Sequence, residues 1–513
     1  MRAGGKNIKG DSMWNWLKKE ENRVTRSIPP DEPPTRVYAE IEKNILYMKE
    51  KLGASFDILY KQTYIGKNKA FLIMDDGMCN NLLVTQQVVA PIMEMRDVPN
   101  DPSEQMAYIR DCISSGIDQK ENYSLDDAVT DVVSGLVILF IDGAPFCEAF
   151  GVQGFPKRAI DNAQTEVQER GAQEAFVESF KDNVALIRRR VRSPVARFEL
   201  QELGATSKTR VCVCYFADRA DKQMIDEIKS RLKKAKLDMV LGAGYLRPFL
   251  ESDVTAIFTS VGTTERPDIA CAEMAEGRAV ILVDGTPFAM IVPYLFTENF
   301  QSMDDYNHRP YYALFIRVLK FFSFLISVFL PGLYVAVCTF HQEILPASML
   351  YDTAVQESIT PLPVMAEAIF IHFLYEIVRE AGLRMPKSVG HAVSIVGALV
   401  IGDTAVSAGL IAAPMLIVVA MTAISSFVVS KIYYPVSVLR FAFMIIGGLA
   451  GFYGIVLGFG VVLFNMCAVT AYGTPYVAPF SPMHLGALWR DSFWRLGWKT
   501  LGKRELQIHS LEK

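Results

Sequence analysis

The sequence lacks the motifs that commonly mark catalytic, metal-binding and nucleotide-binding sites. It contains neither GxSxG nor HExxH, and the GxG at residues 242–244 has neither the third glycine of a dinucleotide site nor the lysine of a phosphate-binding loop. The eight cysteines form no CxxC pair, and the six histidines are scattered. We therefore predict a protein that is not an enzyme and that has no catalytic residue, metal site or cofactor.

The sequence also lacks an excess of charge of one sign. Its 52 lysines and arginines nearly balance 56 aspartates and glutamates, and no long basic stripe is interleaved with aromatic residues. These features argue against nucleic-acid binding. Residues 1–20 have no continuous apolar core, so we expect no signal peptide.

Long apolar runs are present, and they are concentrated in the carboxy-terminal part. They occupy residues 321–340, 364–381, 410–429 and 441–472. The first run would span about 30 Å as a helix, which is the thickness of a bilayer core, whereas the last is too long for one upright crossing. We predict an all-α polytopic membrane domain at residues 309–475 with four to six crossings.

Basic residues set the predicted orientation of this domain. Arg309 and Arg317 precede the first apolar run, and Lys431 and Arg440 mark a return to the same side. Residues 476–513 form a basic tail with several tryptophans, which we expect at the inner membrane surface. Both termini are therefore predicted to be cytoplasmic.

The predicted membrane domain has a polar interruption at Gly402-Asp403-Thr404, followed by Ser407. A carboxylate at membrane depth is costly unless it faces water, a partner or an ion. Asp403, Thr404 and Ser407 are therefore candidates for lining an ion path. The alternative is a short loop at the membrane surface, and the two alternatives have equal weight on the sequence alone.

The run at residues 364–381 carries His372, Glu376 and Glu380 at i, i+4 and i+8, with Arg379 alongside. This spacing places them on one polar stripe of a helix. Such a helix lines a watery path, packs against partner subunits or lies flat at the interface, and we favour the first two. Glu376 and His372 are therefore further ion-path candidates, with a structural ion pair between Glu376 and Arg379 as an equal alternative.

Small residues recur along the last apolar run. Glycines stand at positions 447, 451, 454 and 458, a spacing that lines one helix face. Because glycine lets helices approach closely, Gly447, Gly451, Gly454 and Gly458 are candidates for packing subunits together in a symmetric ring.

The region before the membrane domain alternates helical and strand patterns, which indicates an α/β fold. A buried strand followed by Asp-Gly-x-Pro-Phe occurs twice, with the aspartates at Asp142 and Asp284. We predict two related subdomains at residues 37–192 and 193–308, and the turn context explains both aspartates without catalysis. Residues 1–36, which end in a proline-rich segment, are predicted to be a disordered tail and linker.

An arginine-rich segment, residues 186–192, stands between the two predicted subdomains. Such a cluster can bind lipid headgroups or clamp an acidic neighbour. A solvated helix face with internal salt bridges is at least as well supported, so we assign this segment no chemistry.

Taken together, several ordered segments resemble the A-type subunits of the GerA family of spore germination proteins. The segments are Arg170-Gly171-Ala172, Leu186-Ile187-Arg188-Arg189-Arg190, Glu265-Arg266-Pro267-Asp268, Leu282-Val283-Asp284-Gly285-Thr286-Pro287, Pro331-Gly332-Leu333-Tyr334-Val335-Ala336, Arg379-Glu380-Ala381-Gly382-Leu383-Arg384-Met385-Pro386 and Val396-Gly397-Ala398-Leu399-Val400-Ile401-Gly402-Asp403. Ala172 is more similar to the stage V sporulation protein AF branch, because nutrient-receptor A subunits tend to have proline there.

The resemblance implies a protein of the spore inner membrane with a cytosolic amino-terminal domain. It implies a homo-oligomer, with a pentamer as the suggested number, that releases monovalent cations during germination. The implied partners are a transporter-like B-type subunit and a C-type lipoprotein, or another membrane partner for an AF-like protein. The alternative function is a non-conducting membrane receptor or scaffold that recruits germination partners through its cytosolic α/β domain.

Overall fold

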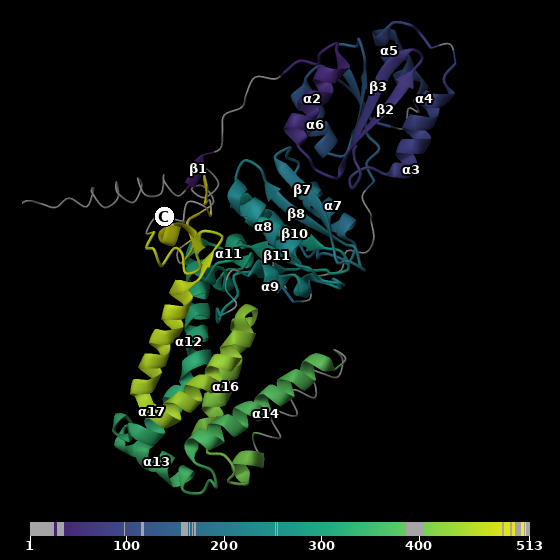
Figure 1. The fold of residues 1–513 in the computed structure, drawn as a ribbon. Helices are drawn as coiled ribbons and strands as arrows, with labels where there is room; N and C mark the ends of the chain where they lie inside the picture. Colours follow the sequence, from purple (N-terminus) through teal and green to yellow (C-terminus); the bar gives the residue numbers. More distant parts are fainter. Residues whose placement is uncertain are drawn as a thin grey trace, which may run out of the picture.

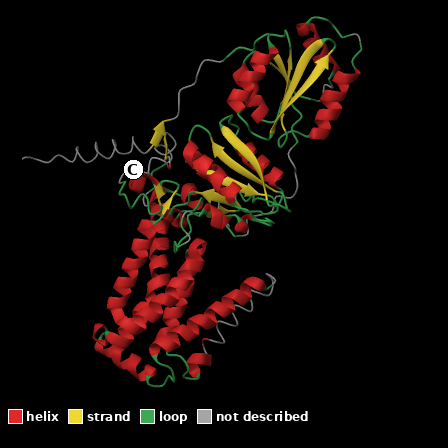
Figure 2. Ribbon diagram, viewed as in Figure 1, coloured by secondary structure: helices red, strands yellow, loops and turns green. Residues whose placement is uncertain are grey.

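The computed structural model contains two α/β units and a bundle of long helices, and one of the two units lies between the other unit and the bundle (Figure 1). It describes the chain except residues 1–24, 28–34, 97, 114–116, 155–162, 164, 167, 169–170, 252, 254, 386–401, 403, 485–486, 493–494, 498–503, 507 and 509–513. We call residues 35–154 the first unit, residues 171–300 the second unit and residues 310–468 the helical bundle. The two larger sheets lie in the two units (Figure 2).

The first unit is a five-stranded sheet with helices on both faces. Its main elements are α2 (Ile41–Leu52), β2 (Ile58–Ile65), β3 (Asn68–Asp75), α4 (Ala90–Glu94), α5 (Pro102–Cys112), β4 (Gln119–Asn122), α6 (Leu125–Val133), β5 (Val137–Ile141) and β6 (Cys147–Phe150). The strand order is β2-β3-β5-β6-β4, with antiparallel neighbours. Because side chains alternate along a strand, Ile73 and Ile138 pack with α2 and α6, whereas Leu72 and Leu139 pack with α4 and α5 on the other face.

The second unit repeats this design. Its main elements are α7 (Phe180–Arg190), β7 (Ala196–Leu203), β8 (Thr209–Phe216), α8 (Lys222–Lys234), α9 (Arg247–Leu250), β9 (Gly262–Thr264), α10 (Pro267–Ala275), β10 (Ala279–Val283) and β11 (Ala289–Val292). The strand order is β7-β8-β10-β11-β9, again with antiparallel neighbours. Val211 and Ile281 face α8, whereas Cys212 and Val280 face α7 and α10.

The repeated Asp-Gly turn follows the fourth strand of each unit. Asp142 Oδ1 accepts the backbone N–H of Ile41 at 3.1 Å, and Asp284 Oδ1 accepts that of Phe180 at 3.4 Å. Ile41 and Phe180 are the first residues of α2 and α7, so each aspartate satisfies a free N–H and places negative charge at a helix N-terminus. This structural role accounts for both aspartate side chains without a catalytic function.

Helix α7 lies on the other side of the boundary that the sequence analysis places after residue 192. Its buried residues Phe180, Val184 and Ile187 pack in one hydrophobic core with strands of the second sheet. Its place in the repeat also matches α2, the first helix of the first unit. We therefore assign α7 to the second unit.

Arg188 of α7 reaches back to the first unit. Its Nε lies 2.9 Å from Asp57 Oδ2 and 3.4 Å from Asp75 Oδ2, and the three side chains are at most 2% exposed. Among the alternatives for residues 186–192, Arg188 therefore clamps acidic neighbours. The backbone joins the units as well, because the N–H of Phe56 donates to the carbonyl of Phe198 at 3.1 Å.

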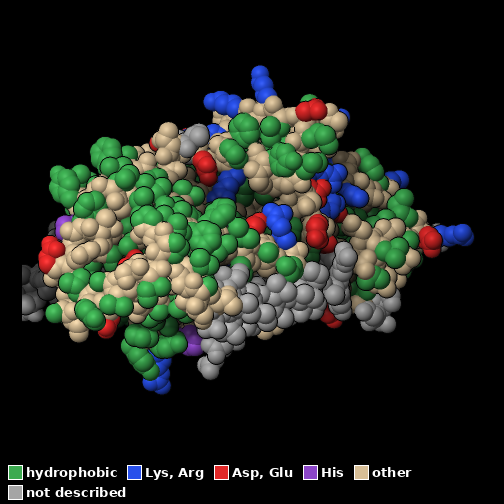
Figure 3. All heavy atoms as spheres, turned by 90° about the horizontal axis from the view of Figure 1, so that it is seen from below, with side chains coloured by type: hydrophobic (Ala, Val, Ile, Leu, Met, Phe, Trp, Pro, Cys, Tyr) green, Lys and Arg blue, Asp and Glu red, His purple; other side chains and the backbone are tan. Residues whose placement is uncertain are grey.

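The helical bundle contains α12 (Pro310–Phe340), α13 (Ala347–Glu357), α14 (Val364–Arg384), α16 (Ala413–Val428) and α17 (Tyr433–Ala468). Two helical stretches, Pro310–Phe340 and Ser430–Ala468, are long and apolar enough to cross a membrane. Hydrophobic side chains cover much of the bundle when it is viewed from its end (Figure 3). The number of crossings stays a prediction, since residues 386–401 lie outside the description.

Helix α17 is divided into two arms at Gly451, whose φ of 62° and ψ of −153° are not helical. The arms contact each other, because Gly458 on the second arm faces Phe443 on the first. The run at residues 441–472 is too long for one upright crossing as a single helix, and the break divides it into shorter parts.

The four candidate packing glycines of α17 have neighbours within their own chain. A Cβ at Gly447 would lie 2.4 Å from the carbonyl oxygen of Gly332 on α12, so this close helix contact requires glycine. Gly451 forms the break, and Gly454 and Gly458 face the first arm of α17. Their role in packing subunits together stays a prediction.

The chain after α17 fastens the bundle to the second unit. The Tyr472 hydroxyl donates to the Leu250 carbonyl at 2.8 Å, and the Tyr472 ring is part of the second unit's hydrophobic core. Asn465 Oδ1 accepts the N–H of Ile257 at 3.0 Å. The second unit and α17 are therefore joined by a buried side chain as well as by the chain itself.

The two ends of the chain correct two expectations. Three residues of the predicted disordered tail form β1 (Thr25–Ser27), which pairs with β14 (Arg504–Leu506). Arg495, expected at the membrane surface, is 1% exposed and donates to the backbone carbonyl of His308 at 2.8 Å. Part of the basic tail therefore packs on protein.

Candidate functional site

Glu376 on α14 is the centre of a polar cluster inside the bundle. Its Oε1 accepts the Tyr433 hydroxyl at 2.7 Å and the Ser437 hydroxyl, both from α17. Its Oε2 lies 3.1 Å from Arg379 Nε, and Arg440 Nη1 lies 3.5 Å from Oε1. The ion pair with Arg379 that the sequence analysis considered is therefore present, together with a second arginine.

Arg440 connects four helices. It is fully buried, and its Nε donates to the Ser327 carbonyl at 3.0 Å on α12. Its Nη2 donates to the hydroxyls of Ser327 and Ser426, which are 2.7 Å apart, and Ser426 belongs to α16. A buried guanidinium is tolerated only when its donors and charge are matched, and here carboxylate, hydroxyl and carbonyl oxygens from three other helices supply the match.

This position corrects the use of Arg440 as a marker of the cytoplasmic side. The side chain lies two turns inside α17. A lone arginine in an apolar run was the available signal, but a positive charge near the end of such a run is also typical of its flank. Its hydroxyl partners come from distant helices, so the sequence pattern could not distinguish the two positions.

His372 lies on the buried side of α14 rather than on a continuous polar stripe. It is 0% exposed, and its Nδ1 lies 2.9 Å from the Ala368 carbonyl. Its Nε2 is buried and has no hydrogen-bond partner among the residues that the structure describes. Glu380, one turn past Glu376, pairs with Arg384 at the exposed end of the helix. The stripe therefore changes from buried to exposed along α14.

The polar interruption is only partly described. Asp403 lies outside the described residues, whereas Thr404 and Ser407 are exposed. The segment leads into α16, where the Ala412 N–H donates to Glu367 Oε1 at 2.7 Å. Glu367 is fully buried, and its place in the apolar run at residues 364–381 did not mark it as a candidate. Thr404 and Ser407 are exposed in the described chain, whereas Glu376 is only 19% exposed.

The edge of α14 opens onto a hollow at the bundle surface. Glu376, Ile377, Arg379, Glu380 and Ala381 line a space of about 490 Å³. This edge combines two carboxylates and a guanidinium with apolar residues, so charged groups at the surface of the bundle are continuous with the buried cluster.

The described residues form two α/β units joined to an apolar bundle that buries a charged cluster, and two helices of this bundle are long and apolar enough to cross a membrane, which fits a membrane-associated protein. The chain belongs to the GerA family: the model for the Bacillus/Clostridium GerA spore germination protein matches residues 46–507. The resemblance carried by the sequence motifs is thereby confirmed.

Individual relatives include spore germination proteins and a sporulation protein. The chain is 34% identical to spore germination protein KA of Bacillus subtilis, over 94% of this chain and 89% of that protein. It is 27% identical to stage V sporulation protein AF of Bacillus subtilis, over 90% and 93%. A crystal structure of the N-terminal domain of the A subunit of the Bacillus megaterium germinant receptor GerK3 is 26% identical, covering 52% of this chain and 99% of that one, with a TM-score of 0.41.

Proposed function

We propose that this protein is a multi-pass membrane subunit of a spore germination complex whose homo-oligomer conducts monovalent cations. Family membership supports the role in germination, and the two long apolar helices support the membrane location. The proposed setting is the spore inner membrane, with both termini in the cytoplasm. The proposed partners are a transporter-like B-type subunit and a C-type lipoprotein, or another membrane protein for an AF-like subunit.

The observation that carries the channel proposal is the charged edge of α14. Glu376 and Glu380 line a hollow beside α14, and Glu380, which is 48% exposed, is the one of the two that water or a neighbouring subunit would reach first. In a symmetric oligomer each such carboxylate is repeated around the axis. A ring of carboxylates attracts cations and excludes anions, so this edge, with Asp403, Thr404 and Ser407, is the proposed ion path.

A specific observation favours the alternative, a non-conducting receptor or scaffold. Glu376 is paired with both Arg379 and Arg440, and it accepts hydroxyls from Tyr433 and Ser437. A carboxylate neutralised in this way stabilises helix packing and attracts cations weakly. Under this alternative the α/β units recruit partners, and the cluster only maintains the bundle.

Cation flux from liposomes that contain the purified full chain tests the two functions. Glu380→Gln and Asp403→Asn should change conductance or cation selectivity, whereas Asp352→Asn, an exposed acidic position on α13, should leave both unchanged. Glu380→Gln is preferred to Glu376→Gln because Glu380 is half-exposed, so folding should survive.

The outcomes separate the alternatives. Flux that these variants alter supports the channel, and flux only with a B-type or C-type partner makes the chain one component of a heteromeric channel. Silence in every combination, with folding and oligomerisation verified, contradicts the channel and favours the scaffold.

A further inference from the structure

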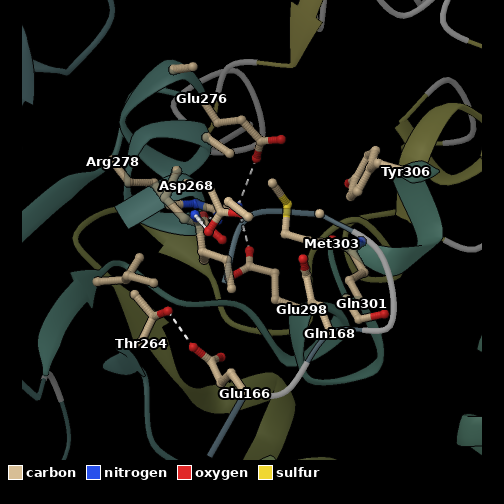
Figure 4. Close-up of a pocket in the computed structure, with 18 of the residues that line it drawn as sticks. Glu166, Gln168, Thr264, Asp268, Glu276, Arg278, Glu298, Gln301, Met303 and Tyr306 are labelled. Atoms are coloured by element: carbon tan, nitrogen blue, oxygen red, sulfur yellow. Dashed lines mark hydrogen bonds and ion pairs between the residues drawn. The ribbon is translucent and has the colours of Figure 1, made fainter. Parts of the chain in front are cut away.

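The carboxylates in the cavity between the second unit and the carboxy-terminal tail have a cation of their own. The cavity has a volume of about 470 Å³ and is lined by Glu276, Glu298 and Asp491 among others. Arg278 Nη2 lies 3.1 Å from Glu276 Oε2 and 2.5 Å from Glu298 Oε1, so this guanidinium matches both charges (Figure 4). These carboxylates therefore need no positive partner from outside the chain.

Glu367 in the helical bundle is a buried carboxyl group of a different kind. It lies in the first turn of α14, at the end of the bundle that is remote from the α/β units (Figure 1). Its Oε1 accepts the Ala412 N–H at 2.7 Å, where α16 begins. Its side chain is fully buried, and its Oε2 has no hydrogen-bond partner among the described residues. One oxygen of this carboxyl group is therefore satisfied and the other is not.

The titratable groups that face Glu367 supply no positive charge. From α13 comes Glu357, a second carboxylate, which repels a negative charge on Glu367. From α12 come Tyr334 and Cys338, whose side chains are ordinarily uncharged at neutral pH. From α16 comes the backbone N–H of Ala412. Within the described part of the chain, the charged neighbour of Glu367 is therefore negative.

Glu376, further along the same helix, shows what matched charge looks like. It pairs with Arg379 and Arg440. Ala368, which follows Glu367 directly, belongs instead to a buried apolar cluster with residues of α12, α16 and α17. An ionised carboxylate is costly in such surroundings without a matched cation, and a group of this kind becomes neutral by taking up a proton.

We propose that Glu367 is a proton-binding site, with the proton on Oε2 while α13, α14 and α16 are packed as in this structure. Oε1 still accepts the Ala412 N–H, so the contact between α14 and α16 is kept in the protonated form. A proton fits better than a metal ion, because no group of three or more His, Cys, Asp or Glu side chains in the described residues is arranged to hold one.

This site links the packing of the bundle end to pH. When α13 separates from α14, water reaches Oε2 and the carboxyl group ionises as it does in solution. The packed arrangement therefore binds the proton more tightly than the opened one, so packing weakens as pH rises, by up to about tenfold per pH unit for one proton. Residues 404–412 connect the proposed ion path to this site, so proton release should increase cation flux. Only this last step rests on the proposed function.

Hydrogen exchange of the full chain, corrected for the intrinsic effect of pH, tests the site at the amides of Ala412 and Ala413. In the wild type their protection should fall from mildly acidic to mildly alkaline pH, by up to about tenfold per pH unit. Glu367→Gln is neutral at every pH and keeps an oxygen for the Ala412 N–H, so it should fold and remove this dependence. Glu343→Gln, an exposed acidic position between α12 and α13, is the matched control and should keep it. Glu357→Gln should also keep it, because the titrating group is still present.

Infrared difference spectroscopy supplies a second readout that does not depend on opening. The wild type should show the C=O stretching band of a buried protonated carboxyl group, Glu367→Gln should lose it, and Glu343→Gln should retain it. The proposal is overturned if Glu367→Gln keeps the band or the pH dependence. It is also overturned if replacing N-methylglucamine by K⁺, rather than changing pH, alters protection at Ala412, because Oε2 would then hold a metal cation.

Cation flux from liposomes separates this site from the channel. Flux that rises with pH in the wild type but not in Glu367→Gln supports the link between the two. Absence of flux with the infrared band intact contradicts the channel and supports the proton site, whereas flux without the band contradicts the proton site.

Discussion

The two α/β units share one topology but are tied to the rest of the chain by different contacts. The second unit takes Tyr472 into its hydrophobic core and donates the N–H of Ile257 to Asn465 of α17. The first unit contacts the second through Arg188, which lies between Asp57 and Asp75. One copy of the fold is therefore anchored to the bundle by a buried aromatic ring and uncharged hydrogen bonds, whereas the other is held to its neighbour by buried charge in addition to the Phe56–Phe198 backbone bond.

The two units therefore have the same fold, but their contacts with the rest of the chain should differ in their response to pH and salt. An apolar ring buried in a core is insensitive to pH and salt. A guanidinium between two carboxylates responds to changes in the charge of its partners, and removal of the guanidinium is strongly destabilising because it leaves the carboxylates buried without their cation. We therefore expect changes in conditions to act on the contact between the units before they act on the junction with the bundle.

The largest expected effect comes from Arg188→Met, which removes the charge that holds the units together. It leaves Asp57 and Asp75 buried and unpaired, and breaking such a buried network costs about 3–5 kcal/mol. Hydrogen exchange of the full chain should show lost protection around Phe56 and Phe198, while the region around Leu250 and Tyr472 stays protected.

Arg192→Met is the matched control, because Arg192 is exposed and follows α7 directly. It should leave both regions unchanged. Equal behaviour of the two variants would show that the buried cluster of Arg188, Asp57 and Asp75 does not hold the units together. The two units would then not differ in the way proposed here.

The features of the fold that the sequence predicted are local ones. The alternating strands and the repeated Asp-Gly turn mark two α/β copies because each pattern is complete within a few residues. The boundary after residue 192 was wrong for α7, since nothing in residues 180–190 shows which sheet will cover Val184 and Ile187. That choice depends on strands far along the chain.

The residues of the candidate site also separate into those that a local sequence pattern reveals and those that depend on distant parts of the chain. Glu376 was singled out from the sequence because a carboxylate breaks the period of an apolar helix, and its place in an ion path stays a prediction. Arg440 was taken for a flanking charge, and its burial depends on Ser327 and Ser426, which lie on two other helices. Glu367 was missed because its partner, the Ala412 N–H, becomes its neighbour only in the folded bundle.

A second test sharpens the comparison through pH. Burial and the charge of Asp57 raise the pKa of Asp75 from 3.8 to about 7, against the opposing effect of Arg188. Because the folded state binds this proton more tightly than the unfolded state, the contribution of Asp75 to stability falls as pH rises from 3.8 to about 7 and then levels off. The contact between the units should therefore be stronger at about pH 6 than at about pH 8.

Asp75→Asn, which stays neutral, should flatten this dependence when protection at the contact is measured by hydrogen exchange corrected for the intrinsic effect of pH. Protection around Tyr472 supplies the internal reference, because its anchoring contacts, the ring in the core and the hydroxyl bond to the Leu250 carbonyl, contain no carboxylate. If both junctions change equally with pH, or if Asp75→Asn retains the slope, the buried charge is not what distinguishes them.

The smallest expected effect compares the two aspartates at equivalent places in the repeat. Replacing a residue that satisfies a helix N-terminus costs about 0.5–2 kcal/mol, so Asp142→Ala should destabilise the first unit and Asp284→Ala the second. The bond from the Phe180 N–H to Asp284 is 3.4 Å, whereas that from the Ile41 N–H to Asp142 is 3.1 Å, and the longer bond should be the weaker. Denaturant titration followed by hydrogen exchange in each unit should therefore give a larger loss for Asp142→Ala. A larger loss for Asp284→Ala would mean that the second unit depends more on its Asp-Gly turn than the first unit does. The second unit would then not be the more rigid of the two, contrary to what their contacts indicate.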